Sequence, residues 1–196
     1  MQFSKVVIGA AVSAALLAGC ESTQVKSEAP VAQEQKVAAP AVQEAAVTTQ
    51  LFDVVHDGRY YSFYDFATYQ SFLSVGETAY RLTRIGGGPH GETLVFGLAK
   101  ADKKKGAETP AAMIWDGKSQ VEGEFYGEMR KHGRIYVFSS KDDMDAVRQV
   151  GEPSYMYTQI GAGPKGETVV FVLNKSNKKE KPIALMAEYK TINGMK

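Results

Sequence analysis

Short runs of apolar and aromatic residues alternate with turn-forming residues along most of the chain after residue 50. The runs Arg59–Phe63 and Arg134–Phe138 have the composition that is typical of strands. Each run follows a turn that contains glycine, Asp57-Gly58 or His132-Gly133. Because glycine accepts a positive φ, these turns predict β-hairpins.

A short helix is predicted after each of these strands. Asp65 and Ser140 are suited to cap a helix N-terminus, and Gly76 and Gly151 are suited to end a helix. Three further strands are predicted after each helix. After the first helix they are Ala79–Ile85, Thr93–Leu98 and Ala111–Trp115. After the second helix they are Ser154–Ile160, Thr168–Leu173 and Ile183–Met186.

The two halves repeat one another in sequence. The segment Ile85–Thr93 returns almost unchanged as Ile160–Thr168, at an offset of 160 − 85 = 75 residues. Without gaps, residues 56–104 and 131–179 share about 22 identities in 49 positions. The sequence therefore predicts an α+β fold with mostly antiparallel sheets, built as a tandem duplication of a β-β-α-β-β-β unit.

The predicted units are residues 51–119 and residues 120–196. A unit of about 70 residues would be marginally stable alone, because a small domain buries too little of its surface. We therefore expect the two units to pack together through an apolar sheet or helix face.

The N-terminus carries a second signal. Lys5 precedes the apolar run Val6–Leu17, which is too short to span a membrane as a helix. The run ends in Leu17-Ala18-Gly19-Cys20, which resembles the bacterial lipobox. This resemblance implies a signal peptide at residues 1–19 and acyl chains on Cys20. The alternative is an ordinary secretory signal with an incidental cysteine.

The lipobox resemblance also implies a location. Glu21, rather than Asp, follows the cysteine, and in enteric-type bacteria this implies the outer membrane, with the protein facing the periplasm. Residues 20–50 are predicted to form the lipidated Cys20 and a disordered tether, because residues 21–50 contain no aromatic residue and are interrupted by Pro30 and Pro40.

Composition and charge exclude several classes of function. Lys and Arg number 23 against 22 Asp and Glu, so no basic field favours nucleic acid. His56, His90 and His132 do not match one another in the repeat, and Cys20 is the sole cysteine, so neither a metal nor a cofactor is expected. No motif for nucleophilic catalysis occurs, so the protein is not expected to be an enzyme.

The repeated loops carry most of the candidate binding residues. Successive backbone N–H groups of such glycine-rich loops can bind an anion, or the glycines can serve the geometry of a wide hairpin. Arg59 and Arg134 can bind a carboxylate or phosphate, or pair with Glu77 and Glu152. The candidates are Gly86, Gly88, Pro89, His90, Gly91, Glu92, Gly161, Gly163, Pro164, Lys165, Gly166, Glu167, Arg59 and Arg134.

Other residues allow further interpretations. The lysines at 103–105 and 178–181 form either contacts with an anionic surface or solvated turns. The segment Gly133–Ser140, followed by an acidic short helix, is similar to YHS-type small domains. The metal-binding cysteines of that family are absent, so this resemblance implies no metal role.

Three functions remain after these exclusions. The first is a non-catalytic envelope lipoprotein that is anchored through Cys20 and binds or scaffolds another envelope protein. The second is a lipoprotein that binds a small ligand, either a glycan, a peptide or an anion. The third is a hydrolase that uses Glu92 or Glu167, which are identical in both copies and could act as general bases if burial raised their pKa.

Overall fold

The computed structural model describes residues 48–196, so the predicted signal peptide, Cys20 and most of the predicted tether lie outside the described residues. Each half begins with a hairpin. β1 (Thr48–His56) pairs with β2 (Arg59–Phe63), and β5 (Glu124–Lys131) pairs with β6 (Arg134–Phe138).

The hairpin turns have the backbone that the sequence predicts. Asp57 and Gly58 have φ of 47° and 69°, and His132 and Gly133 have φ of 51° and 72°. Two successive residues with positive φ match the twist of the flanking strands. β1 starts at Thr48, so the first strand takes up the last three residues assigned to the tether.

α1 (Phe66–Val75) and α3 (Lys141–Val150) are the predicted helices. The Asp65 carboxylate accepts a hydrogen bond from the Thr68 N–H at 2.6 Å, and Gly76 ends the helix with φ of 83°. The last residue of each helix, Val75 or Val150, is 72% or 78% exposed, directly before the glycine that ends the helix.

The next two strands of each half are confirmed, but the third is wrong. The confirmed strands are β3 (Arg81–Arg84), β4 (Thr93–Gly97), β7 (Tyr155–Gln159) and β8 (Thr168–Leu173). After the turns η1 (Lys100–Asp102) and η2 (Gly106–Glu108), the first half ends in a helix, α2 (Pro110–Trp115), and the second half ends in α4 (Ile183–Ile192). Proline suits the start of a helix, where an N–H is not needed, and the Ala, Leu and Met that follow are strong helix formers.

All eight strands of the described residues form one sheet in the order β3-β4-β2-β1-β5-β6-β8-β7. Four of its seven pairings are antiparallel, and the β1–β5, β2–β4 and β6–β8 pairings are parallel. The fold is therefore α+β. The strand order of the second half mirrors that of the first.

The two halves join through the edges of their sheets, not through their faces. β1 and β5 form a parallel ladder from Thr48–Glu124 to Val54–Arg130. The expectation of face-to-face packing is wrong, because the first strand of each half leaves one edge unpaired and the two edges hydrogen-bond to each other.

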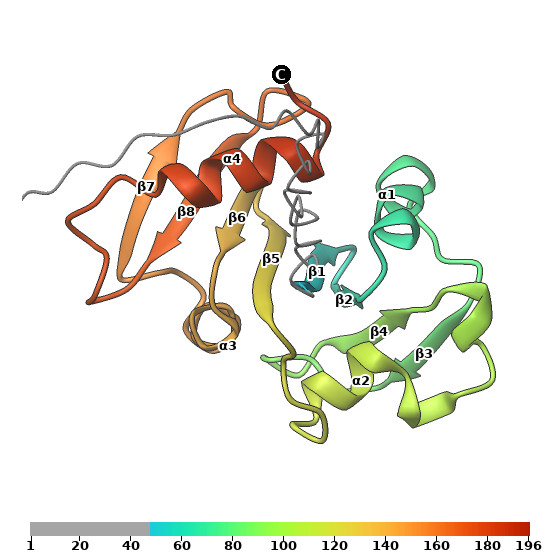
Figure 1. The fold of residues 1–196 in the computed structure, drawn as a ribbon. Helices are drawn as coiled ribbons and strands as arrows, with labels where there is room; N and C mark the ends of the chain where they lie inside the picture. Colours follow the sequence, from blue (N-terminus) through green and yellow to red (C-terminus); the bar gives the residue numbers. More distant parts are fainter. Residues whose placement is uncertain (1–47) are drawn as a thin grey trace, which may run out of the picture. The chain divides into compact units, whose positions relative to one another are not determined.

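Equivalent helices of the two halves lie on opposite faces of the sheet. α1 and α4 pack into one apolar cluster, whereas α2 and α3 pack on the other face (Figure 1). This arrangement follows from the parallel junction. A two-fold rotation that superimposes two parallel neighbouring strands has its axis along them, and so exchanges the faces of the sheet. None of the helices at residues 48–196 combines the length and the apolarity that crossing a membrane requires.

Candidate functional site

The repeated segments form the loops between the outer strands of each half. Loop 1 (residues 85–92) joins β3 to β4, and loop 2 (residues 160–167) joins β7 to β8. In loop 1 the Glu92 Oε2 accepts a hydrogen bond from the His90 N–H at 2.8 Å, and in loop 2 the Glu167 Oε2 accepts one from the Lys165 N–H at 2.7 Å. Each glutamate therefore binds the backbone of its own loop.

The loop glycines serve this geometry. Gly86 and Gly91 have φ of 68° and 88°, and their counterparts Gly161 and Gly166 have φ of 72° and 82°. A Cβ on Gly88 would lie 2.7 Å from the Glu92 carboxylate, and one on Gly163 would lie 2.5 Å from that of Glu167. The glycine pattern thus makes room for the glutamates.

Each loop lies against the helix of the other half and forms a cleft with it. The loop-1 cleft has a volume of about 310 Å³ and is lined by Gly87, Pro89, Trp115, Asp145, Arg148 and Gln149. The loop-2 cleft has a volume of about 250 Å³ and is lined by Gln70, Leu73, Ser74, Arg130, Pro164, Lys165, Glu167 and Asn193.

The two clefts use matching positions of the repeat. The helix residues Gln70, Leu73 and Ser74 correspond to Asp145, Arg148 and Gln149, since 145 − 70, 148 − 73 and 149 − 74 all equal 75. Because the helices lie on opposite faces of the sheet, the clefts also open on opposite faces. The chain therefore presents one type of cleft twice.

The loop-2 cleft contains a chain of hydrogen bonds that ends at a buried acid. Arg130 donates from Nη1 to the Glu167 Oε1 and from Nε to the Tyr69 hydroxyl, both at 2.7 Å. The Tyr69 hydroxyl donates to the Glu128 Oε2 at 3.1 Å. Tyr126 and Asn193 donate to the Glu128 Oε1, each at 2.6 Å. Glu128 is 0% exposed, so these partners replace its hydration.

The protonation states of the residues in this hydrogen-bond network are set by their surroundings. Burial is the largest cause, and the negative charge of Glu128 the second, of a raised pKa for Tyr69 and for Tyr126. Both tyrosines therefore stay neutral. Burial would raise the pKa of Glu167, but hydrogen bonds from its own and the Lys165 N–H and from Arg130 outweigh this effect and lower it. A general base needs a raised carboxyl pKa, so this shift argues against catalysis through Glu167.

The loop-1 cleft also has an arginine and a buried acid, but here the arginine binds the acid directly and not the loop glutamate. The Arg148 Nε and the Tyr60 hydroxyl both donate to the Asp53 Oδ2 at 2.7 Å. Arg148 also donates to the Asp145 Oδ1 at 2.6 Å and lies over the Trp115 ring, 4.6 Å from its centroid. Asp53 is 0% exposed.

The two buried acids stand at matching positions, since 128 − 53 = 75. Their arginine partners do not match. The loop-1 cleft takes Arg148 from α3, where the first half has Leu73, and the loop-2 cleft takes Arg130 from β5, where the first half has Val55. Sequence reasoning missed these residues. The signal that could have revealed this network is an acidic residue at the same repeat position within each first strand, Asp53 in β1 and Glu128 in β5.

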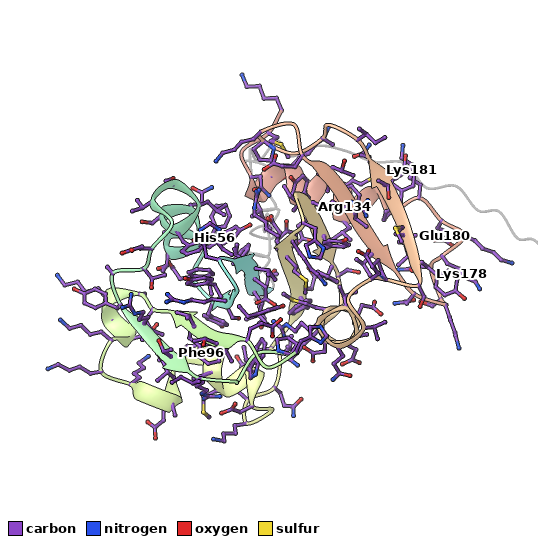
Figure 2. The ribbon with its side chains drawn as sticks, turned by 180° about the vertical axis from the view of Figure 1, so that it is seen from behind. His56, Phe96, Arg134, Lys178, Glu180 and Lys181 are labelled. Atoms are coloured by element: carbon purple, nitrogen blue, oxygen red, sulfur yellow. The ribbon has the colours of Figure 1, made fainter. Side chains whose placement is uncertain are left out.

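The remaining candidates lie elsewhere. Arg59 lines a separate polar cavity, and Arg134 lies on β6 (Figure 2). Neither arginine forms an ion pair within residues 48–196, so the alternative pairing with Glu77 or Glu152 is not formed. His90 and Lys165 are exposed on their loops.

The lysine-rich turns contact aromatic residues at the sheet edges. Lys103 lies over the Tyr80 ring at 5.3 Å, and its counterpart Lys178 lies over the Tyr155 ring at 4.4 Å. Figure 2 shows Lys178, Glu180 and Lys181 on the segment between β8 and α4. Charged lysines beside edge strands hinder the addition of a further strand, so these turns protect the sheet.

Within residues 48–196 no group of three or more His, Cys, Asp or Glu side chains is arranged to hold a metal ion. Comparisons with protein-family models, with curated proteins and with solved structures found no match. The two clefts and the N-terminal motif are therefore the features of this chain that bear on its function.

Proposed function

We propose that this protein is a bacterial outer-membrane lipoprotein that is anchored through Cys20, faces the periplasm, and binds another envelope protein without catalysing a reaction. The observation that carries this proposal is the pair of matching clefts between each repeated loop and the helix of the other half. Two clefts of one type on opposite faces suit a bivalent contact, in which occupation of both raises the overall affinity.

Exposed apolar residues beside the loops support a protein partner. Ile85 and Ile160 stand at the start of loop 1 and loop 2 and are 92% and 90% exposed. The same residue type is exposed at the same place in both halves. Each half therefore offers a partner one exposed apolar contact at the start of its repeated loop.

The membrane anchor rests on the N-terminal motif alone. Leu17-Ala18-Gly19-Cys20 provides the lipidation site, and the residues between Cys20 and β1 join the anchor to the folded module. More than one acyl chain is needed for stable anchoring, as lipidation of this kind supplies.

The arginine in each cleft is already paired within the chain. Arg148 pairs with Asp53 and Asp145, and Arg130 pairs with Glu167, so both guanidinium groups keep a fixed orientation. These pairs give the two clefts rigid polar walls. Hydrolysis by Glu92 or Glu167 has less support, because each carboxylate braces its own loop.

The test is photocrosslinking in intact cell envelopes, with a photoreactive residue placed at His90 and, in a second strain, at Lys165. We expect the same protein adduct from both positions, because the two clefts are built from matching positions of the repeat. A third strain with the photoreactive residue at the exposed Lys104 is the matched control and should give no such adduct. Adducts to glycan or lipid alone would contradict the proposal.

The anchor is tested separately by Cys20→Ala. We expect this variant to lose incorporation of a labelled fatty acid and to leave the membrane fraction, while the wild-type protein sediments with outer membranes. Full membrane association of the variant would contradict the lipid anchor.

A further inference from the structure

A polar cavity of about 490 Å³ lies in the first half, on the sheet face that carries α1, and is separate from both clefts. A volume of this size is within the range of small-ligand sites. Its lining residues are His56, Asp57, Arg59, Tyr61, Gly76, Glu77, Thr78, Arg81, Thr83, Ile85, Thr93 and Val95.

Two arginines approach the cavity from opposite corners. In the sheet register Arg59 is the neighbour of Thr93, and Arg81 is the neighbour of Gly97. Thr93 and Gly97 are four residues apart on β4, so both arginines lie on the same face. With strands about 4.8 Å apart and about 3.3 Å per residue, their Cα atoms are about 16 Å apart.

Neither of these arginines is paired directly with an acid. Within residues 48–196 neither Arg59 nor Arg81 forms an ion pair, whereas Asp57 lies 3.3 Å from the His56 imidazole. The cavity wall also includes Thr78, which is 9% exposed and whose hydroxyl has no hydrogen-bond partner. The cavity thus offers two arginines without a direct ion pair and several hydroxyl groups, beside the carboxylates of Asp57 and Glu77.

The second half provides an internal comparison. Of the twelve lining positions, eight carry the same residue 75 positions later, and four differ: His56, Asp57, Thr78 and Arg81 are replaced by Lys131, His132, Pro153 and Met156. There Lys131 donates from Nζ to the Gly151 carbonyl oxygen at 3.1 Å, and the Tyr136 hydroxyl donates to Glu152 at 3.0 Å.

The counterparts of Tyr61 and Glu77 are therefore bonded to each other in the second half, whereas Tyr61 and Glu77 are not. The second half also lacks the second arginine, since Met156 stands in place of Arg81. This difference points to a ligand for the first half alone. Both halves have the same fold, so the fold alone does not account for the different residues at these positions.

We propose that the cavity binds a small ligand with two carboxylates, of the size of an acidic dipeptide, and that Arg59 and Arg81 each bind one of them. Arginine binds carboxylates through paired, charge-assisted hydrogen bonds. Two separated arginines match two separated acidic groups.

The test is titration calorimetry on the full-length protein in detergent micelles, with the dipeptide N-acetyl-Glu-Glu-amide, which has two carboxylates, as the probe. We expect saturable binding that weakens with added salt, because the contacts are exposed ion pairs. Arg59→Gln and Arg81→Met should each weaken binding by about tenfold or more. Arg134→Gln, the matched change in the second half, should leave binding unchanged.

Unchanged far-ultraviolet circular dichroism and thermal midpoints of the variants establish that they are folded. Absence of dipeptide binding, or equal binding by Arg59→Gln and the wild type, would overturn the proposal. Inorganic phosphate in place of the dipeptide serves as the second probe. If it bound more tightly, the carboxylate assignment would be wrong. None of these results depends on the envelope partner, so the cavity and the clefts are tested independently.

Discussion

At the level of single residues, the buried acids Asp53 and Glu128 define the centre of the molecule. Each is 0% exposed, and each is stabilised by residues of both halves. Arg148 reaches Asp53 across 95 positions of sequence, and Tyr69 reaches Glu128 across 59. Removal of one partner of such a buried pair is costly, because the other charge loses its compensation.

We therefore predict that Arg148→Met lowers the free energy of unfolding by about 3–5 kcal/mol. Urea denaturation followed by circular dichroism measures this loss. Arg134→Met is the control on the exposed surface and should change stability by less than about 0.5 kcal/mol. The double variant Asp53→Asn/Arg148→Met should recover part of the loss, since no unpaired charge stays buried. A loss from Arg148→Met no larger than that of the control would contradict the buried pair.

At the level of helices and strands, the two halves use the same elements with different packing. β4 has Gly97 where β8 has Val172, and β5 has Gly127 where β1 has Phe52. The Gly97 position is filled by the Phe63 ring, which a Cβ would approach to 2.2 Å. At Gly127 a Cβ would lie 2.8 Å from the Met144 Sδ. Each glycine is thus explained by a large neighbour.

We predict that Gly97→Val, which would make β4 more like β8, destabilises the protein by about 1–3 kcal/mol through overpacking against Phe63. The shift in the urea midpoint at constant slope measures this change. The cost should be smaller in a Phe63→Leu background, where the ring is absent. An equal cost in both backgrounds would show that the ring is not the cause.

At the level of the whole module, one sheet and its apolar clusters run through both halves. One cluster includes Phe52 and Tyr69 from the first half together with Tyr126 and Phe171 from the second. The β1–β5 ladder adds backbone hydrogen bonds across the junction. Neither half can therefore lose its structure without exposing apolar surface of the other.

We predict a single cooperative unfolding transition for the full chain in scanning calorimetry. The calorimetric and van't Hoff enthalpies should agree, as they do for a two-state domain. Two separate transitions, each with about half of the enthalpy, would show that the halves unfold independently and would contradict the shared core.

The sequence by itself determined the local elements of this protein. The hairpin turns at Asp57-Gly58 and His132-Gly133, the helix caps Asp65 and Ser140, and the positions of the repeated loops all follow from interactions between residues close in the chain. The last element of each half was assigned wrongly, since a short apolar run fits a strand as well as a helix and its periodicity cannot decide between them.

Only the tertiary structure decided how the halves meet and which side chains meet with them. The choice of β1 and β5 as the junction placed α1 and α3 on opposite faces, and so set each loop beside the helix of the other half. The pairs Arg148–Asp53 and Tyr69–Glu128 exist because of that choice. Such contacts join residues far apart in the chain, and local propensities carry no information about them.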